Sequence, residues 1–190
     1  VGAVFLLLQN YNKNDIKENE VSVTVYFSNS NFNSELADCS LVYPVERSVA
    51  SSVISSEDIK DLTMRELFQG PSKDEEKLGY SSFFGKETKD ILNSTNFDAG
   101  TLRVDIKDIR GIIPNASTSC GSMSLTAEIE KTLKQFPDVK KVIISLNGSA
   151  IDFYDWIQMG CTKENDFCDG EIREDNVDVF TCRPKERQAG

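Results

Sequence analysis

The amino-acid sequence of 190 residues predicts an α+β fold, a two-layer sandwich with two helices on one face of a mixed sheet. Runs of alternating apolar and polar residues, typical of half-buried strands, occur at 21–28 and 101–107. Apolar residues at helical spacing occur between these runs, at about 55–69, and after them, at 124–136. With two further strands, the expected order of elements is β-β-α-β-α-β.

The first two expected strands are 21–28 and 41–49. In the first run (VSVTVYFS), three valines and a phenylalanine point to one face, and the side chains between them point to the other. The second run (LVYPVERSV) also alternates, but Pro44 cannot donate a hydrogen bond to a neighbouring strand. We therefore expect the second strand at an edge of the sheet.

The first helix is expected to begin near Ser55 or Ser56, because the acidic residues that follow favour a helix N-terminus. Its inward face is formed by Met64, Leu67 and Phe68. Gly70 and Pro71 end it, since glycine allows a left-handed cap and proline cannot continue the helix. Residues 72–100 are mainly polar and contain several glycines, so we expect a long loop with room for one short strand.

The second half of the chain is expected to form a strand, a helix and a strand. After the strand at 101–107, the helix at 124–136 carries an apolar stripe and ends at Pro137. The last strand is 139–146 (VKKVIISL). Because its apolar residues 142–144 are consecutive, we expect it to be buried on both faces and central in the sheet.

Composition excludes several classes of function. The chain has 21 basic and 31 acidic residues, a net charge of −10 and no histidine. Nucleic-acid binding is not expected, because phosphates are bound by clustered Lys and Arg. Without histidine, Ser-His-Asp and Cys-His catalysis and the commonest zinc ligand are absent. We expect no cofactor and no metal.

The two ends of the chain differ from the middle. Residues 1–8 (VGAVFLLL) are entirely apolar but shorter than the about 20 residues that span a bilayer. They are either the end of a membrane anchor or signal segment, or a core strand. The polar run that follows favours the anchor. The expected organisation is therefore anchor and spacer at 1–20, a domain at 21–150, and an acidic, cysteine-bearing extension at 151–190.

The chain has five cysteines: Cys39, Cys120, Cys161, Cys168 and Cys182. Outside the cytoplasm, a Cys161–Cys168 or a Cys168–Cys182 disulfide would close a loop in the extension. Three unlinked thiols in a reducing compartment are the alternative. Because five is an odd number, at least one thiol stays free or pairs between chains.

Six segments together resemble the GerM domain of bacterial sporulation and germination proteins, over about residues 21–148. They are VTVYFSNS at 23–30, LVYPVERSV at 41–49, LFQGPS at 67–72, GYSSFF at 79–84, GTLRVDI at 100–106 and IEKTLKQFPDVKKVIISLNG at 129–148. The last segment is the most specific, because a helix that ends in Gln-Phe-Pro and a strand that ends in Asn-Gly are typical of the family.

The resemblance implies a non-enzymatic domain on the extracytoplasmic side of the bacterial membrane, tethered by its N-terminal anchor. It also implies a fold similar to the ring-building motifs of secretion systems, and in spore formers one member assembles into a ring between mother cell and forespore. The expected partners are envelope proteins or further copies of the chain. The helix surfaces and the strand with Pro44 are the expected contacts.

A peptidoglycan- or glycan-binding module is the alternative function. The segment 151–156 (IDFYDW) places aromatic rings beside carboxylates, a combination that suits sugars. The candidate contact residues are Asp152, Tyr154, Asp155 and Trp156. Packing of these aromatic residues onto the domain is the simpler interpretation.

The acidic stretch 164–176 does not form an EF-hand. Aligning Gly170 with the glycine of a calcium loop puts Phe167 at a ligand position, and the final glutamate is missing. We favour a solvated acidic loop here. The alternative is an irregular calcium site with oxygen ligands from Asp166, Asp169 and Glu171.

Overall fold

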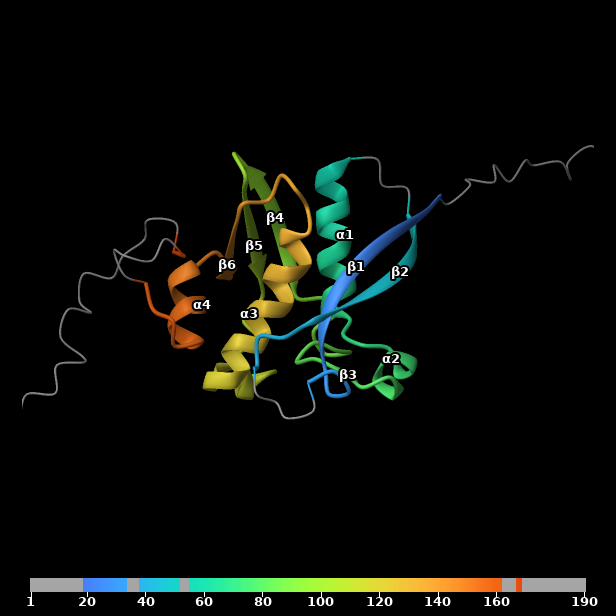
Figure 1. The fold of residues 1–190 in the computed structure, drawn as a ribbon. Helices are drawn as coiled ribbons and strands as arrows, with labels where there is room; N and C mark the ends of the chain where they lie inside the picture. The colour runs from blue at the N-terminus through green and yellow to red at the C-terminus, as the bar shows by residue number, and fades with distance from the viewer. Residues whose placement is uncertain (1–18, 34–37, 52–54, 162–166, 169–190) are drawn as a thin grey trace, which may run out of the picture.

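The computed structural model describes residues 19–33, 38–51, 55–161 and 167–168 (Figure 1). The elements are β1 (Asn19–Asn29), β2 (Tyr43–Ser51), α1 (Ser56–Phe68), α2 (Lys73–Lys77), β3 (Tyr80–Ser81), β4 (Leu92–Asp98), β5 (Thr101–Ile106), a 3-10 helix (Pro114–Ser117), α3 (Ser119–Lys134), β6 (Lys141–Leu146) and α4 (Ala150–Trp156). Within these described ranges, no helix combines the length and the apolar character that crossing a bilayer requires.

The first sheet has the order β2-β1-β3, and both outer strands run antiparallel to β1. Val23, Val25 and Phe27 of β1 are buried, as their alternation with polar residues predicts. Pro44 lies opposite Tyr26 on β2, which is an outer strand of this sheet. The predicted edge position of the proline-containing strand is therefore confirmed.

The second sheet has the order β4-β5-β6 and is mixed, because β5 is antiparallel to β4 and parallel to β6. The expected central position of the last strand is wrong, since β5 is central and β6 is at the edge. β6 is nevertheless buried on both faces, because α3 and α4 pack against it. The consecutive apolar residues of β6 therefore reflect the helices that cover both of its faces, and not a central position in the sheet.

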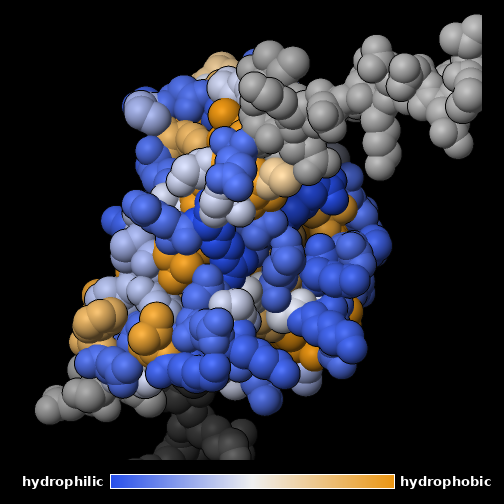
Figure 2. All heavy atoms as spheres, turned by 90° about the vertical axis from the view of Figure 1, so that its right-hand side faces the viewer, coloured by the Kyte–Doolittle hydropathy of each residue, from blue (hydrophilic) through white to orange (hydrophobic). Residues whose placement is uncertain are grey.

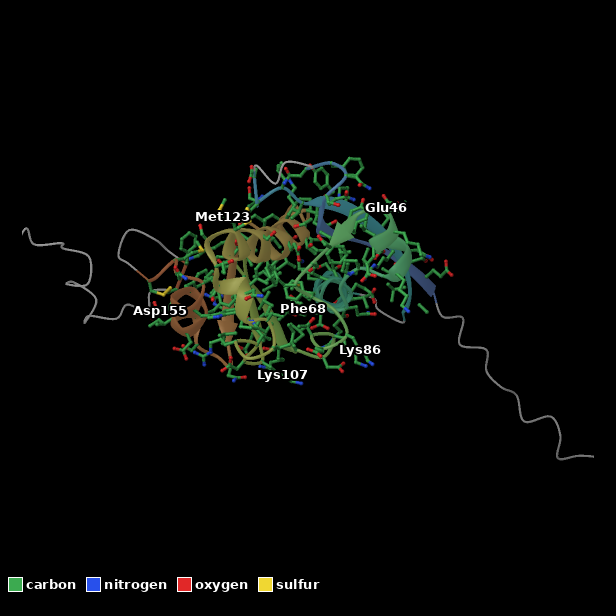
Figure 3. All side chains as sticks on the ribbon, turned by 90° about the horizontal axis from the view of Figure 1, so that it is seen from below. Glu46, Phe68, Lys86, Lys107, Met123 and Asp155 are labelled. Atoms are coloured by element: carbon green, nitrogen blue, oxygen red, sulfur yellow. A yellow bond between two sulfur atoms is a disulfide. The ribbon has the colours of Figure 1, made fainter. Side chains whose placement is uncertain are left out.

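Helices α1 and α3 pack against each other and contact both sheets. Both contact β1, and on their other side α1 contacts β4 while α3 contacts β6. In Figure 1, β1 crosses in front of the two helices and the second sheet lies behind them. Phe68, at the end of α1, is fully buried and lies near the centre of the molecule in Figure 3. The α+β class is confirmed, but two small sheets with helices between them replace the expected single sheet.

The ends of α1 agree with the sequence prediction. Ser55 is the N-cap, and its hydroxyl accepts a hydrogen bond from Asp58 N at 3.1 Å. Gly70 follows the helix with a φ of +71°, and a Cβ at this position would lie 2.1 Å from the carbonyl oxygen of Phe84. Only glycine fits this close approach, so Gly70 fixes where the chain turns after α1.

Strand β4 and the start of α3 are not predicted from the sequence. The expected loop 72–100 left room for one short strand, and the structure has α2, β3 and β4 in it. Leu92 is the one buried residue of β4, so this strand shows little apolar alternation. α3 begins at Ser119, five residues earlier than expected, because Thr118 caps it by accepting a hydrogen bond from Gly121 N at 3.1 Å. The small residues of this first turn contribute nothing to an apolar stripe.

Candidate functional site

A cavity of about 280 Å³ lies between the end of β1, the β3 region and the middle of α3. We call it the serine–glutamate cavity, and it is lined by Ser28, Ser81, Ser82, Phe83, Ser124 and Glu128. Ser124 and Glu128 are four residues apart on α3 and therefore project from the same face of the helix. The packing of α3 against β1 brings this face over Ser28.

Glu128 is buried, with 1% of its surface exposed, whereas Ser81 is exposed at the rim of the cavity. Ser82 Oγ donates a hydrogen bond to Glu128 Oε2 at 2.5 Å and accepts one from Phe84 N at 2.9 Å. The other carboxyl oxygen, Oε1, accepts a bond from Ser28 N at 3.5 Å, which is at the outer limit for such a bond. One side of the carboxyl group is thus held firmly and the other weakly.

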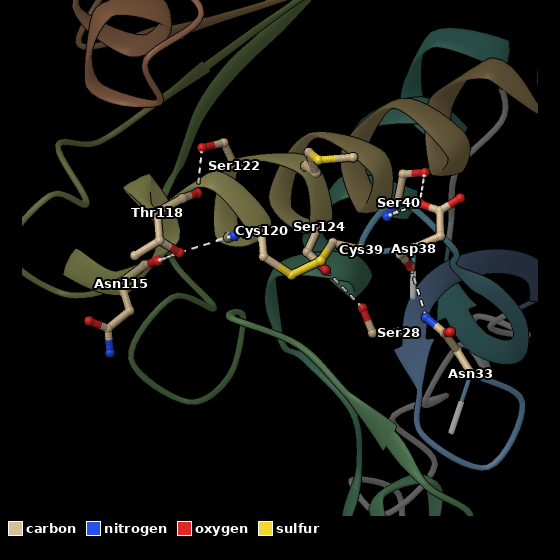
Figure 4. Close-up of a disulfide and its surroundings, with 12 residues drawn as sticks. Ser28, Asn33, Asp38, Cys39, Ser40, Asn115, Thr118, Cys120, Ser122 and Ser124 are labelled. Carbon is tan, nitrogen blue, oxygen red and sulfur yellow. Dashed lines mark hydrogen bonds between the residues drawn. A yellow bond between two sulfur atoms is a disulfide. The ribbon is translucent and has the colours of Figure 1, made fainter. Parts of the chain in front are cut away.

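A second polar contact closes one wall of the cavity. Ser28 Oγ and Ser124 Oγ are 3.0 Å apart and share a hydrogen bond between β1 and α3. Figure 4 shows this pair beside the Cys39–Cys120 disulfide, which ties the loop before β2 to the first turn of α3. The wall is therefore fixed by a covalent link next to it.

Burial raises the pKa of Glu128 to about 8, although the hydrogen bonds from Ser82 and Ser28 act in the opposite direction. None of the six residues that line the cavity is basic, so no positive charge there favours the ionised form. At neutral pH the carboxyl group is therefore mainly protonated. In this form it both donates and accepts hydrogen bonds, as the serine hydroxyls do.

Lys60 is a second buried ionisable residue, but its surroundings are different. Its Nζ donates to Asp138 Oδ2 at 2.7 Å and lies 4.5 Å from the ring centre of Phe97 and 5.5 Å from that of Phe136. The ammonium group beside Asp138 lowers the pKa of that carboxyl. The Phe-Pro-Asp segment at 136–138 thus encloses a buried cation, which is a structural role.

The sequence-predicted glycan contacts lie on α4, which packs onto β6. Tyr154 is buried, its hydroxyl accepts a hydrogen bond from Ile144 N at 3.3 Å, and its ring stacks on Phe167. Tyr154 thus packs onto the domain, which is the interpretation favoured from the sequence, and its ring is not available for the alternative glycan contact. Burial also raises its pKa to about 12. Contact through Asp152, Asp155 and the half-buried Trp156 stays a prediction.

Four cysteines form two disulfides. Cys161 is bonded to Cys168, one of the two pairings considered from the sequence, and Cys182 lies outside the described residues. Cys39 is bonded to Cys120 across 81 residues, with their Cα atoms 5.3 Å apart. The second pairing was not predicted, because nothing in the spacing of two cysteines so far apart indicates contact.

In the described part of the chain, no three Asp, Glu, Cys or His side chains gather closely enough to hold a metal ion. The acidic residues considered for calcium, Asp166, Asp169 and Glu171, lie outside the described residues. The serine–glutamate cavity offers a single carboxyl group, so it fits hydrogen-bonded ligands better than metals. The serines that form it are scattered along the sequence, which gave no signal for the site.

A profile of the Germane family, described as "Sporulation and spore germination", matches residues 24–152. Among solved structures, the tandem GerMN domains of the sporulation protein GerM from Bacillus subtilis are 24% identical with a TM-score of 0.47, and the match covers 74% of this chain. The chain spans only 43% of that tandem structure. No curated protein sequence gives a significant match.

The first GerMN domain of the same Bacillus subtilis protein is also similar. It is 20% identical with a TM-score of 0.43, and the match covers 67% of this chain and 84% of that domain.

Proposed function

The chain belongs to the Germane family of sporulation and spore germination domains, and we propose that it is a non-enzymatic envelope domain that acts by assembly. It would contact further copies of itself or other envelope proteins on the outer side of the bacterial cytoplasmic membrane. The observation that carries this proposal is the family match over residues 24–152, which includes both sheets and the two long helices. A likeness to ring-building motifs is part of the proposal.

The two disulfides support the proposed location outside the cytoplasm. Disulfides form and persist outside the cytoplasm and are rare inside it. Cys39–Cys120 and Cys161–Cys168 both lie within distances that a disulfide spans, with Cα separations of 5.3 and 5.7 Å. The proposed anchor at 1–20 lies almost wholly outside the described residues, and tethering to the membrane is part of the proposal.

Two exposed apolar side chains support a protein contact near β3. Phe32 is 65% exposed and Leu78 is 63% exposed. Their loops lie together, because Asn31 Nδ2 donates to the carbonyl oxygen of Leu78 at 2.9 Å. The side of the molecule with β2 and α2 is mainly hydrophilic, with separate apolar side chains (Figure 2). A contact at the Phe32 and Leu78 loops would bury apolar surface that the described fold leaves in water.

Sedimentation of the oxidised 190-residue chain over a wide concentration range tests the proposal, alone and with extracts of envelope proteins fractionated to single components. We expect association that Phe32→Ser with Leu78→Ser weakens at least about tenfold, because burial of two large apolar side chains is lost. Lys77→Ser, close in sequence but charged, serves as the control. A strict monomer that binds no purified envelope component would overturn the proposal.

A further inference from the structure

The carboxyl group of Glu128 is held at one oxygen by a short hydrogen bond and at the other by a longer one. Ser82 donates to Oε2, and the hydroxyl of Ser82 already accepts from Phe84 N. Oε1 has Ser28 N as a partner at 3.5 Å, and the hydroxyl of Ser28 also interacts with the carboxyl group. A carboxyl oxygen whose bond is at the outer limit of hydrogen-bond distance has room for a shorter one, so Oε1 is suited to a ligand hydroxyl group.

The serine pair adds a second group of the same kind. Ser28 Oγ and Ser124 Oγ form one hydrogen bond with each other, and each hydroxyl has capacity for a further bond. Both residues are half-buried and line the cavity. A ligand that enters therefore meets several groups that can both donate and accept, which is the complement of a hydroxyl group.

Charge restricts the ligand further. An anion is disfavoured, because no lining residue is basic and the chain carries a net charge of −10. A cation requires an ionised carboxylate, which burial of Glu128 opposes, and there is only one carboxyl group in the lining. A neutral polar ligand remains.

Size and the single aromatic ring narrow the class. At about 280 Å³, the cavity is smaller than the sites that hold drug-sized molecules. Phe83 is half-buried in its lining and supplies an apolar face beside the polar groups. A sugar ring combines an apolar C–H face with hydroxyl groups around its edge, and it matches both surfaces.

We infer that the serine–glutamate cavity binds a saccharide, one neutral sugar ring at a time, through Glu128, Ser28 and Ser124 with Phe83 against the ring. This site lies away from α4, where the sequence placed a glycan contact. Binding at this site does not require self-association, so it is tested separately from the assembly proposal.

The test is a ¹⁵N NMR titration of the oxidised 190-residue chain with N-acetylglucosamine, its β-1,4-linked trimer and glucose. We expect saturable shifts of the amide signals of Ser28, Ser82 and Ser124 with at least one of them. Calcium chloride and methylammonium chloride are the cation probes, and we expect no saturable shift with either.

Four variants sharpen the result. Ser124→Ala should weaken binding about three- to tenfold, because one hydrogen bond is lost. Phe83→Leu, which keeps an apolar side chain but removes the ring, should weaken it about threefold through loss of the ring face. Ser119→Ala, on the exposed first turn of the same helix, should leave the affinity unchanged. Glu128→Gln should bind within about threefold of the original chain, because an amide is also a neutral donor and acceptor.

Two results would overturn the inference. One is the absence of saturable shifts with all three saccharides in a chain whose spectrum shows that it is folded. The other is saturable binding of a cation at these residues that Glu128→Gln abolishes, which would assign the cavity to an ionised carboxylate.

Discussion

Lys60 and Glu128 are buried to the same extent, each 1% exposed, but only Lys60 has a partner of opposite charge. The Lys60 ammonium group lies beside Asp138 and two aromatic rings. Glu128 faces serine hydroxyls and a cavity, and its pKa rises to about 8. The carboxylate of Asp138 balances the positive charge of Lys60, whereas burial disfavours the charged form of Glu128.

This difference indicates a structural role for Lys60 and a functional role for Glu128. Lys60 donates to Asp138 and to the carbonyl oxygen of Ser56 and faces two aromatic rings, so these contacts hold the cation. Around Glu128, a buried carboxyl group is kept although burial disfavours its charge more than the hydrogen bonds from Ser82 and Ser28 favour it. Such groups with shifted pKa values are found more often at functional sites than elsewhere.

The largest expected effect on the free energy of unfolding comes from loss of the Cys39–Cys120 disulfide beside the cavity. Replacing Cys39 and Cys120 together by Ser should lower the free energy of unfolding by about 4 kcal/mol, because the bond closes a loop of 81 residues in the unfolded chain. Cys161→Ser with Cys168→Ser should cost less, since those residues are 7 apart. Denaturant unfolding measures both. Equal losses would show that loop length does not govern these links.

The second largest effect on the free energy of unfolding is expected from loss of the buried Lys60 ammonium group. Lys60→Ala should lower the free energy of unfolding by about 3 kcal/mol, because it empties a buried site between aromatic rings. Lys77→Ala removes a lysine whose pair with Asp74 is exposed, and it should change stability by less than about 0.5 kcal/mol. If the two substitutions had equal effects in denaturant unfolding, the structural role of Lys60 would be refuted.

The smallest expected effect concerns pH. Glu128 titrates at about 8 in the folded chain and at an ordinary value of 4.5 when unfolded, so between these values the folded state holds a proton that the unfolded state has released. Stability should therefore fall as pH rises from 5 to 8, by about 2 kcal/mol after allowance for water reaching the cavity. Glu75, Asp108 and Asp138 have lowered pKa values and act only at more acidic pH.

Glu128→Gln removes this titration and keeps the shape of the side chain. Its free energy of unfolding should vary little from pH 5 to 8, as measured by urea unfolding at each pH. If the variant and the original chain showed the same slope, another group would be responsible.

Sequence patterns predicted the parts of the fold in which apolar spacing is decisive. β1 alternates cleanly, and α1 has a serine cap, an apolar stripe and Gly70 at its end. β4 was missed because it is paired through its backbone and buries few side chains. The separation into two sheets was missed too, because a periodic pattern shows which face of an element is apolar but not which element covers it.

The candidate site was not predictable for a related reason. Ser28, Ser82, Ser124 and Glu128 are ordinary polar residues in the sequence, and only the packing of α3 against β1 and β3 makes them a cavity. Tyr154 is the reverse case, because packing onto the domain was the favoured interpretation of its segment and its ring is buried. Burial decides both cases, and burial depends on contacts that are distant in sequence.

The most direct test of the contrast between the two buried ionisable residues, Lys60 and Glu128, is a ¹³C NMR titration of side-chain carboxyl groups in the oxidised chain. The account predicts that the Glu128 signal titrates with a midpoint near 8, whereas that of Asp138, beside the buried lysine, titrates below its usual range. A Glu128 midpoint near 4.5, the ordinary value, would show an ionised carboxylate at neutral pH and contradict the account.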